Sequence, residues 1–260
     1  MLSIDTGFVF ALRQEAAGIL DRLKRSQTTC GNGWVFHTGK IDDVSVAIVL
    51  SGVGQENTEE ATKILIDVFA PKSICSAGYA GGLSSRLRQS DICVPEQVIR
   101  ASDRQALDLS RSIPQTTLSM PGKLTLLTVK DVAATPEQKR TLHEQTGAEL
   151  VDMETFAVAD VCRVRKIPFL SIRIILDAVE DRIPQDITKV LEGLNQGSVR
   201  FAGTILGSVW SRPSVMFDLV SLKRRAFSAT ERLTRFAVAE LSRRRLAEKN
   251  IEKLNLLEQE

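Results

Sequence analysis

Short apolar runs rich in β-branched residues recur along the chain, separated by polar or glycine-containing segments. They occupy residues 7–12, 44–50, 73–77, 91–94 and 168–176. Runs of this length and composition predict β-strands. Between them, residues 57–69 and 154–165 carry apolar side chains at spacings of three and four, which predicts helices. Alternation of strands and helices predicts an α/β fold, with a central mixed, mostly parallel β-sheet flanked by helices.

The run at residues 168–176 is almost continuously apolar and begins with Pro168. Such a run predicts a central strand buried on both faces, and proline is accepted at the first position of a strand. In open sheets of this kind, ligands bind at the carboxyl ends of the strands. The residues that directly follow each apolar run are therefore the first candidates for chemistry.

Two other parts of the chain have a different pattern. Residues 101–122 read as a long loop, whereas a helical pattern runs from about residue 186 to the end and is broken near residues 211–214. Beyond the break, an apolar stripe at helical spacing lies beside many arginines; it consists of Leu222, Ala226, Ala229, Leu233 and Ala237. We therefore expect a catalytic domain at residues 1–210 and a basic helical extension at residues 211–260.

Composition places the 260-residue chain among globular proteins, with 43% hydrophobic and 25% charged residues and a net charge of +2. Residues 212–260 hold 11 Lys or Arg against 7 Asp or Glu. This excess is small and no set of aromatic residues accompanies it, so nucleic-acid binding is not expected. The basic tail is expected either to pack on the domain or to contact anionic lipid headgroups weakly.

Several classes of protein are disfavoured by the motifs that the sequence lacks. The four cysteines have no CxxC spacing and are expected to be reduced core residues, and the two histidines have no metal-ligand spacing. GxGxxG, GxxxxGK[ST] and GxSxG motifs do not occur, so neither a cofactor nor a metal is expected. With no signal peptide or membrane span indicated, a cytoplasmic location is expected.

Three carboxylates fall at predicted strand ends or helix starts: Glu15, Glu154 and Asp177. Each alone also suits a helix cap or a first helical turn. Glycine-rich segments at residues 51–57 and 76–83 follow two predicted strands, and glycines let the backbone approach a ligand closely. Together, these features predict a shared cleft at the carboxyl edge of the sheet.

The order of FALRQEA, SGVGQENTEEAT, SAGYAGGL, VDMETFAVADVC and IPFLSIRIILDAVED resembles the 5'-methylthioadenosine/S-adenosylhomocysteine nucleosidase branch of the purine nucleoside phosphorylase superfamily. The resemblance covers roughly residues 7–205. The stretch LLTVKDVAATPEQKRTL and the helical tail are more similar to the hopanoid-associated phosphorylase branch. The resemblance implies a nucleoside phosphorylase fold and an enzyme that cleaves the N-glycosidic bond of a purine nucleoside.

The resemblance also implies roles for individual residues. Asp177 matches the general acid that donates a proton toward N7 of the purine, and Glu15 matches the glutamate that orients and deprotonates the attacking water. Glu154 matches the acceptor of hydrogen bonds from the ribose 2' and 3' hydroxyls, with Met153 packing beside the sugar. Such proton donation and carboxylate assistance are what a glycosidic bond requires.

Further substrate contacts are expected from residues near these carboxylates. Gly78, Tyr79 and Ala80 would lie against the base or sugar, Val53 near the water and sugar, and Arg173 behind Asp177. Met153 and Val53 are also compatible with plain core positions, and Arg173 with a structural ion pair. Tyr79 stands where the family commonly has a serine, so we expect a bulky phenol in the middle of a reshaped pocket.

The sequence allows more than one reaction and more than one substrate. Arg13 is the only cation near the first turn and none lies in SAGYAGGL, so hydrolysis is favoured over phosphorolysis of an adenine nucleoside such as 5'-methylthioadenosine or S-adenosylhomocysteine. The first alternative is phosphorolytic or hydrolytic release of adenine from a lipid-linked nucleoside of the adenosylhopane kind. The second is a non-catalytic nucleoside-binding protein in which Tyr79 plugs the pocket. A homo-oligomer, most simply a dimer, is expected from the family.

Overall fold

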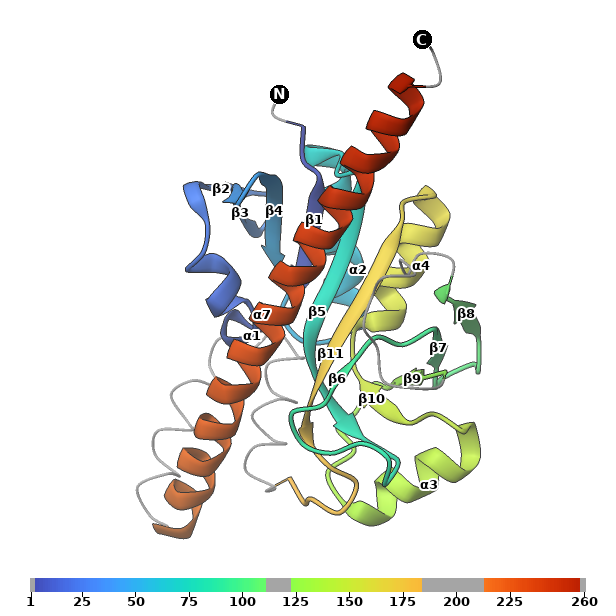
Figure 1. Ribbon diagram of the computed structural model, residues 1–260. Coiled ribbons are helices and arrows are strands. Elements are labelled where there is room, and N and C mark those ends of the chain that lie inside the picture. The colour runs from blue at the N-terminus through green and yellow to red at the C-terminus, as the bar shows by residue number, and fades with distance from the viewer. Residues whose placement is uncertain (1–2, 111–122, 184–212, 258–260) are drawn as a thin grey trace.

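The computed structural model describes residues 3–110, 123–183 and 213–257, which form a mixed β-sheet flanked by helices (Figure 1). The eleven strands in these ranges are β1 (Thr6–Phe10), β2 (Lys24–Gly31), β3 (Trp34–Ile41), β4 (Val44–Leu50), β5 (Ser73–Gly82), β6 (Ile92–Cys93), β7 (Gln97–Arg100), β8 (Ala106–Asp108), β9 (Thr125–Thr128), β10 (Leu150–Asp152) and β11 (Phe169–Asp177). The helices are α1 (Arg13–Leu20), α2 (Gln55–Phe69), α3 (Pro136–Thr146), α4 (Thr155–Arg165) and α7 (Pro213–Leu257). The predicted α/β class is confirmed.

The middle of the sheet is parallel and carries the predicted cleft. β4, β1, β5 and β11 follow one another with parallel pairing, and Arg173 on β11 lies opposite Gly78 on β5. β10 pairs antiparallel with the end of β5 and parallel with β9, while β2 and β3 extend the other side by antiparallel pairing. The carboxyl ends of β1, β5 and β11 therefore meet at one edge.

Helices cover both faces of this sheet. α1 and α7 pack on one face against a cluster that includes Phe8, Phe10 and Ile172, whereas α2 and α4 pack on the other against a cluster that includes Val9 and Ile74. Nearly all of β11 is buried, as its apolar sequence predicts. Side chains on both faces of the central strands are thus removed from water, which is the main stabilising contribution to such a fold.

Strands outside the apolar core were not predicted from the sequence. Every residue of β2 is exposed, so its sequence lacks the hydrophobic alternation of a half-buried strand. Cys30 lies on β2 and is exposed, which corrects the expectation of a core position for this cysteine. Cys75, Cys93 and Cys162 are free and buried as expected.

The C-terminal helix α7 spans the sheet and projects beyond it (Figure 1). Ala229, Leu233 and Ala237 of the predicted stripe are buried against the sheet, because an apolar helical face gains stability by leaving water. No helix in the described residues is long and apolar enough to cross a membrane. Residues 111–122 of the expected loop and the helical pattern at residues 186–211 lie outside the described residues, and β8 lies inside the expected loop.

Candidate active site

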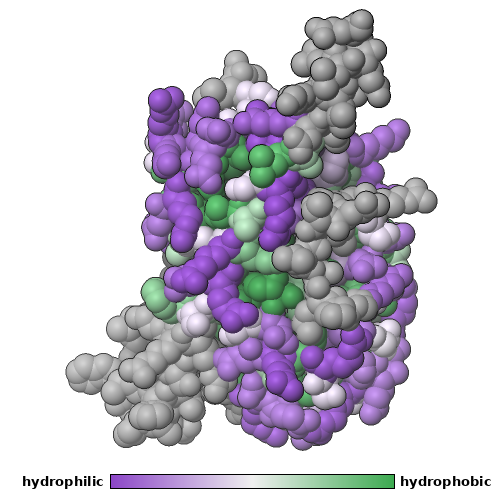
Figure 2. All heavy atoms as spheres, viewed as in Figure 1, coloured by the Kyte–Doolittle hydropathy of each residue, from purple (hydrophilic) through white to green (hydrophobic). Residues whose placement is uncertain are grey.

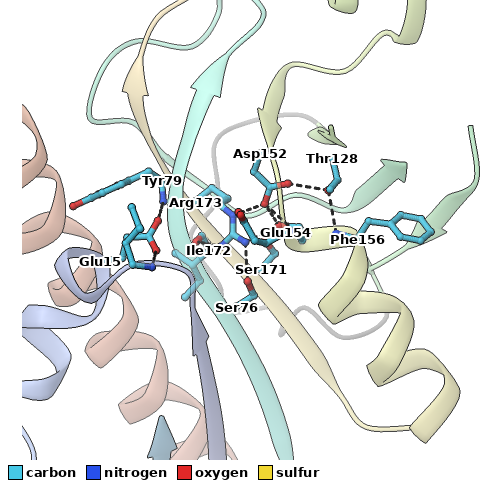
Figure 3. A network of polar contacts seen from close by, with 12 residues as sticks. Glu15, Ser76, Tyr79, Thr128, Asp152, Glu154, Phe156, Ser171, Ile172 and Arg173 are labelled. Carbon is cyan, nitrogen blue, oxygen red and sulfur yellow. Dashed lines mark hydrogen bonds and ion pairs between the residues drawn. The ribbon is translucent and has the colours of Figure 1, made fainter. Parts of the chain in front are cut away.

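Glu15 lies in the first turn of α1, where its carboxylate is buried between two backbone donors. Oε2 accepts from the Leu12 N–H at 2.8 Å, and Oε1 accepts from the Tyr79 N–H at 2.8 Å (Figure 3). The residue is 5% exposed. Burial raises the pKa of Glu15, although these two N–H groups and the charge of Arg173 oppose the increase. A carboxyl group in this setting can exchange a proton closer to neutral pH than a surface glutamate can.

Gly78 on β5 lies directly against this carboxylate. A Cβ atom at position 78 would lie 2.6 Å from Glu15 Oε1 and 3.1 Å from its Cδ. Any residue other than glycine would therefore force the carboxylate to move. The glycine-rich segment predicted to allow a close approach does so here, and the group that approaches is Glu15.

Glu154 begins helix α4 and reaches the glycine-rich turn before α2. Its Oε1 accepts from the Gly54 N–H at 2.8 Å. Burial, followed by the negative charge of Asp152, raises the pKa of Glu154 to about 8; the Gly54 N–H and Arg173 oppose this, whereas Glu15 adds to it. Residues 54 and 154 are far apart in sequence, so this hydrogen bond also joins two segments of the site.

Arg173 is buried and forms a network with Asp152 rather than with Asp177. Its Nε lies 3.0 Å from Asp152 Oδ2, and its Nη2 donates to Ser76 Oγ and Thr155 Oγ1 at 2.7 Å each (Figure 3). The expected place behind Asp177 is thus corrected, and the ion pair considered from the sequence is present. Asp152 also accepts from Thr128 Oγ1 at 2.8 Å, which anchors the network to β9.

A small cavity lies among these groups. Its volume is about 10 Å³ and its lining includes Glu15, Gly78, Glu154, Ser76 and Arg173. A polar cavity of this size holds about one water molecule. The arrangement places a water-sized space between two carboxyl groups that could accept its protons and an arginine that could orient it.

Asp177 ends β11 and lies farther along the same edge. It is paired in register with Gly81, three positions after the Gly78 that faces Arg173, which corresponds to roughly 10 Å along the strand. A Cβ at Gly81 would lie 3.3 Å from Asp177 Oδ2. The same oxygen is 2.5 Å from Lys139 Nζ, on helix α3. The predicted acid is therefore at the other end of the site from the two glutamates, and it is paired with a lysine.

The side chain of Tyr79 does not lie in the middle of the site. Its hydroxyl is 2.6 Å from Thr230 Oγ1 and donates to the Ala226 carbonyl at 3.3 Å, both on α7. Figure 3 shows the ring directed away from the carboxylates, while the backbone N–H holds Glu15. Burial raises the pKa of Tyr79 to about 12, so the phenol is neutral near pH 7. The expectation of a bulky phenol in the pocket was wrong.

The remaining predicted contacts lie outside the lining of the small cavity. Val53 and Ala80 are buried apolar residues, and Met153 is partly buried against a cluster that includes Leu127 and Val151. Val53 and Met153 therefore have the apolar surroundings that the alternative of a core position predicted. Their contact with a substrate remains a prediction.

Several polar residues of the site were missed by the sequence reasoning. They are Ser76, Asp152, Thr155 and Lys139. Asp152 could have been singled out, because it lies two residues before Glu154 in the same motif, VDMETFAVADVC. Lys139 gave no signal, because a lysine in a polar helical segment normally points into solvent. In the described residues, no group of His, Cys, Asp and Glu is arranged to hold a metal ion.

Comparison with known proteins identifies the family of this chain. The model of the phosphorylase superfamily matches residues 5–121 and 125–209. A 5'-methylthioadenosine/S-adenosylhomocysteine nucleosidase of Colwellia psychrerythraea is 27% identical over 236 residues, which cover 78% of this chain and 96% of the relative.

Solved structures agree with the sequence comparison. The crystal structure of a 5'-methylthioadenosine/S-adenosylhomocysteine nucleosidase from Colwellia psychrerythraea, in complex with adenine, has a TM-score of 0.63. The two sequences are 25% identical, and the match covers 79% of this chain and 95% of the nucleosidase chain. Futalosine hydrolase of Helicobacter pylori has a TM-score of 0.62 at 20% identity, covering 80% and 99%. Because the family model spans most of the sequence, the chain belongs to the phosphorylase superfamily.

Proposed function

We propose that this protein hydrolyses the N-glycosidic bond of an adenine nucleoside such as 5'-methylthioadenosine or S-adenosylhomocysteine. The observation that carries the proposal is the water-sized cavity between Glu15, Glu154 and Arg173, at the carboxyl edge of a phosphorylase-superfamily sheet. The nucleosidase of Colwellia psychrerythraea, similar along almost its whole length, supports the substrate class. The cavity suits the attacking water rather than the nucleoside, which needs a pocket of several hundred Å³.

Glu15 is the proposed general base. A water in the cavity would attack C1' of the ribose and pass a proton to the carboxylate of Glu15. The two backbone N–H bonds fix both carboxylate oxygens, so the base is held in place before the substrate arrives. Its raised pKa makes it a stronger base than a surface glutamate while leaving it able to release the proton afterwards.

Glu154 and Asp177 are the proposed groups for the ribose and the purine. An ionised Glu154 can accept hydrogen bonds from both the 2' and 3' hydroxyls, which favours ribosides over 2'-deoxyribosides. As the C1'–N9 bond breaks, its electron pair enters the purine, and N7 takes a proton from the carboxyl group of Asp177. Asp177 lies roughly 10 Å along the strands from the level of Gly78, which leaves room for the nucleoside between the attacking water and the acid.

Water is favoured over phosphate as the nucleophile. Arg173 is the cation that lines the cavity among the described residues, and it is already engaged by Asp152, Ser76 and Thr155. Arg13 is exposed. A phosphate dianion would also need far more room than the water-sized cavity between Glu15 and Glu154.

The experiment measures adenine release from 5'-methylthioadenosine, S-adenosylhomocysteine and adenosine, with and without phosphate. Wild type should release adenine without phosphate, while Glu15→Gln and Asp177→Asn should reduce kcat at least 10³-fold, the scale of losing an essential acid or base. Glu144→Gln, which removes an exposed carboxylate from α3, serves as the control and should keep wild-type activity. Release that requires phosphate would replace hydrolysis by phosphorolysis, and no release from any nucleoside would reject the proposal.

A lipid-linked nucleoside is the second candidate substrate, and one observation on α7 favours it. Phe227 is 75% exposed and Leu246 is 61% exposed on a helix that carries arginines. Figure 2 shows mostly hydrophilic side chains on this face of the molecule, with smaller apolar areas among them. Co-sedimentation with anionic vesicles that weakens with salt, and that is lost in Phe227→Ser, would support a membrane-associated substrate.

The other expectations belong to the same proposal. A non-catalytic binding protein loses its main support, because the Tyr79 ring is bonded to α7 and does not plug the pocket. A homo-oligomer stays an expectation from the family resemblance, and a cytoplasmic location stays an expectation from the sequence. Analytical ultracentrifugation would measure the oligomeric state.

A further inference from the structure

Lys139 is a fully buried lysine at the Asp177 end of the site, where the purine is proposed to bind. It lies in the first turns of α3, and its side chain is 0% exposed. Lysine is almost never completely buried unless it is paired, because removing an ammonium group from water is costly. A buried lysine beside the proposed acid therefore requires an explanation beyond the stability of α3.

The Lys139 ammonium group is surrounded by three protein oxygens, one of a carboxylate and two of backbone carbonyls. Nζ lies 2.5 Å from Asp177 Oδ2 and donates to the carbonyls of Ala178 and Asp181 at 2.7 and 2.8 Å. The Ala178 N–H in turn donates to Asp181 Oδ2 at 2.9 Å, which closes the turn after β11. The ammonium group is fully buried between these two carbonyls and the Asp177 carboxylate. We therefore expect Lys139 to affect the reaction through Asp177, the charged group that it contacts.

We infer that Lys139 is a positioning residue that holds the Asp177 carboxyl group toward the purine and favours its ionised form, so that each purine release requires the pair to take up a proton first. The inference deepens the proposed function and rests on it. A cation in contact with a carboxylate favours the charged form, and in a buried site solvent screens this effect only weakly. Lys139 would thereby set the upper pH limit of catalysis.

The proton balance of one turnover is complete. Solvent supplies a proton to Asp177, which passes it to N7 as the C1'–N9 bond breaks. The attacking water gives its proton to Glu15, which returns it to solvent. No net proton is consumed, but the rate depends on the fraction of enzyme in which Asp177 is protonated.

Other charged groups near the end of β11 are engaged elsewhere. The Asp181 carboxylate accepts from Ala178, and Asp91 on the neighbouring turn accepts from the Arg88 N–H. Two exposed ion pairs join α3 to the turn after β11, Arg140–Glu180 and Arg182–Glu137. Lys139 is thus the cation in direct contact with Asp177 among the described residues.

The test compares kcat against pH for wild type, Lys139→Met and Arg140→Met. Methionine replaces the lysine side chain up to Cε and removes its ammonium group. Arg140 is the neighbouring cation on α3 that pairs with Glu180 on the surface. The ratio of Lys139→Met kcat to wild-type kcat should be at least tenfold larger at pH 8 than at pH 5.5, with KM changing less. Arg140→Met should give a ratio that does not vary with pH.

A substrate whose leaving group needs no proton sharpens the test. For p-nitrophenyl β-riboside the pH dependence of the ratio should disappear, because p-nitrophenolate departs as an anion. If Lys139→Met is insoluble, Lys139→Gln replaces it, since an amide still donates to the turn carbonyls. If wild type releases purine but the ratio of Lys139→Met kcat to wild-type kcat is constant across pH, the role of Lys139 is rejected and the proposed function stands. No release by wild type would remove the proposed function and this inference with it.

Discussion

The two ends of the site surround their carboxyl groups with different kinds of partner. At one end, Glu15 and Glu154 are buried with backbone N–H donors as their nearest partners, and burial raises the pKa of both. At the other end, Asp177 is in contact with the ammonium of Lys139. The protein therefore weakens the acidity of the carboxyl groups facing the water and ribose, while it provides a countercharge for the one facing the base.

This difference shows that the role of a carboxylate depends on its surroundings more than on its type. Dipolar N–H groups orient a carboxylate with less charge stabilisation than a full cation gives, so desolvation dominates near Glu15 and Glu154. A direct lysine partner offsets desolvation at Asp177. Environments that separate the protonation of neighbouring acids are typical of sites that need both an acid and a base.

Replacing Glu154 should have the largest effect on the ribose half of the comparison. In Glu154→Gln one acceptor oxygen becomes a donor, so bidentate acceptance from the ribose hydroxyls is lost. We expect kcat/KM for ribosides to fall about 10²–10³-fold, or about 3–4 kcal/mol. The fall should be much smaller for 2'-deoxyribosides, and a parallel loss for both sugars would contradict the assignment. Glu144→Gln is again the control.

Two glycine substitutions compare the ends directly. Gly78→Ala places a methyl group 2.6 Å from Glu15 Oε1, whereas Gly81→Ala places one 3.2 Å from Val151 Cγ1 and 3.3 Å from Asp177 Oδ2. Gly78→Ala should lower kcat about 10–100-fold by displacing the base. Gly81→Ala should lower it less than about tenfold, because the neighbouring atoms need to move only slightly. Equal effects on kcat would show that Glu15 tolerates displacement.

Substrate binding should release a proton from the ribose end. With a pKa of about 8, Glu154 is protonated in the free enzyme near pH 7, yet it must ionise to accept both hydroxyls. Affinity should therefore rise with pH, by at most about tenfold per unit below pH 8, and level off above it. Calorimetry in buffers of different ionisation enthalpy measures the released proton. Glu154→Gln should release none from this position, and unchanged release would assign the proton to another group.

The smallest expected effect concerns the contact between α7 and the site. Tyr79→Phe removes the hydrogen bond to Thr230 and should lower the free energy of unfolding by about 1 kcal/mol. Its kcat should stay within about twofold of wild type, because the ring points away from the carboxylates. Urea unfolding and steady-state rates measure both, with Ser242→Ala, which removes a bond within α7, as the control. A large loss of kcat would mean that α7 supports Glu15 through Tyr79.

The sequence predicted the central strands and the carboxylates at their ends, because each is encoded locally. Apolar runs mark β1, β4, β5 and β11, and chain order places the residue after each run at the same edge. Gly78 was expected to lie against the substrate; the structure shows it close to Glu15, and its contact with a substrate stays a prediction. The exposed strand β2 and the short strands near β9 carry too little hydrophobic pattern to be predicted.

The protonation of the site and the direction of its side chains were decided by tertiary structure alone. Lys139 stands in a polar helical segment, and only the packing of α3 against the turn after β11 buries it beside Asp177. The ring of Tyr79 is directed by the hydrogen bond between its hydroxyl and Thr230, which lies 151 positions later in the chain. Local sequence sets which groups can ionise or bond, but burial and distant partners set the free energy of doing so. The sequence therefore determined the chemical groups of this site, and the fold determined their charges and orientations.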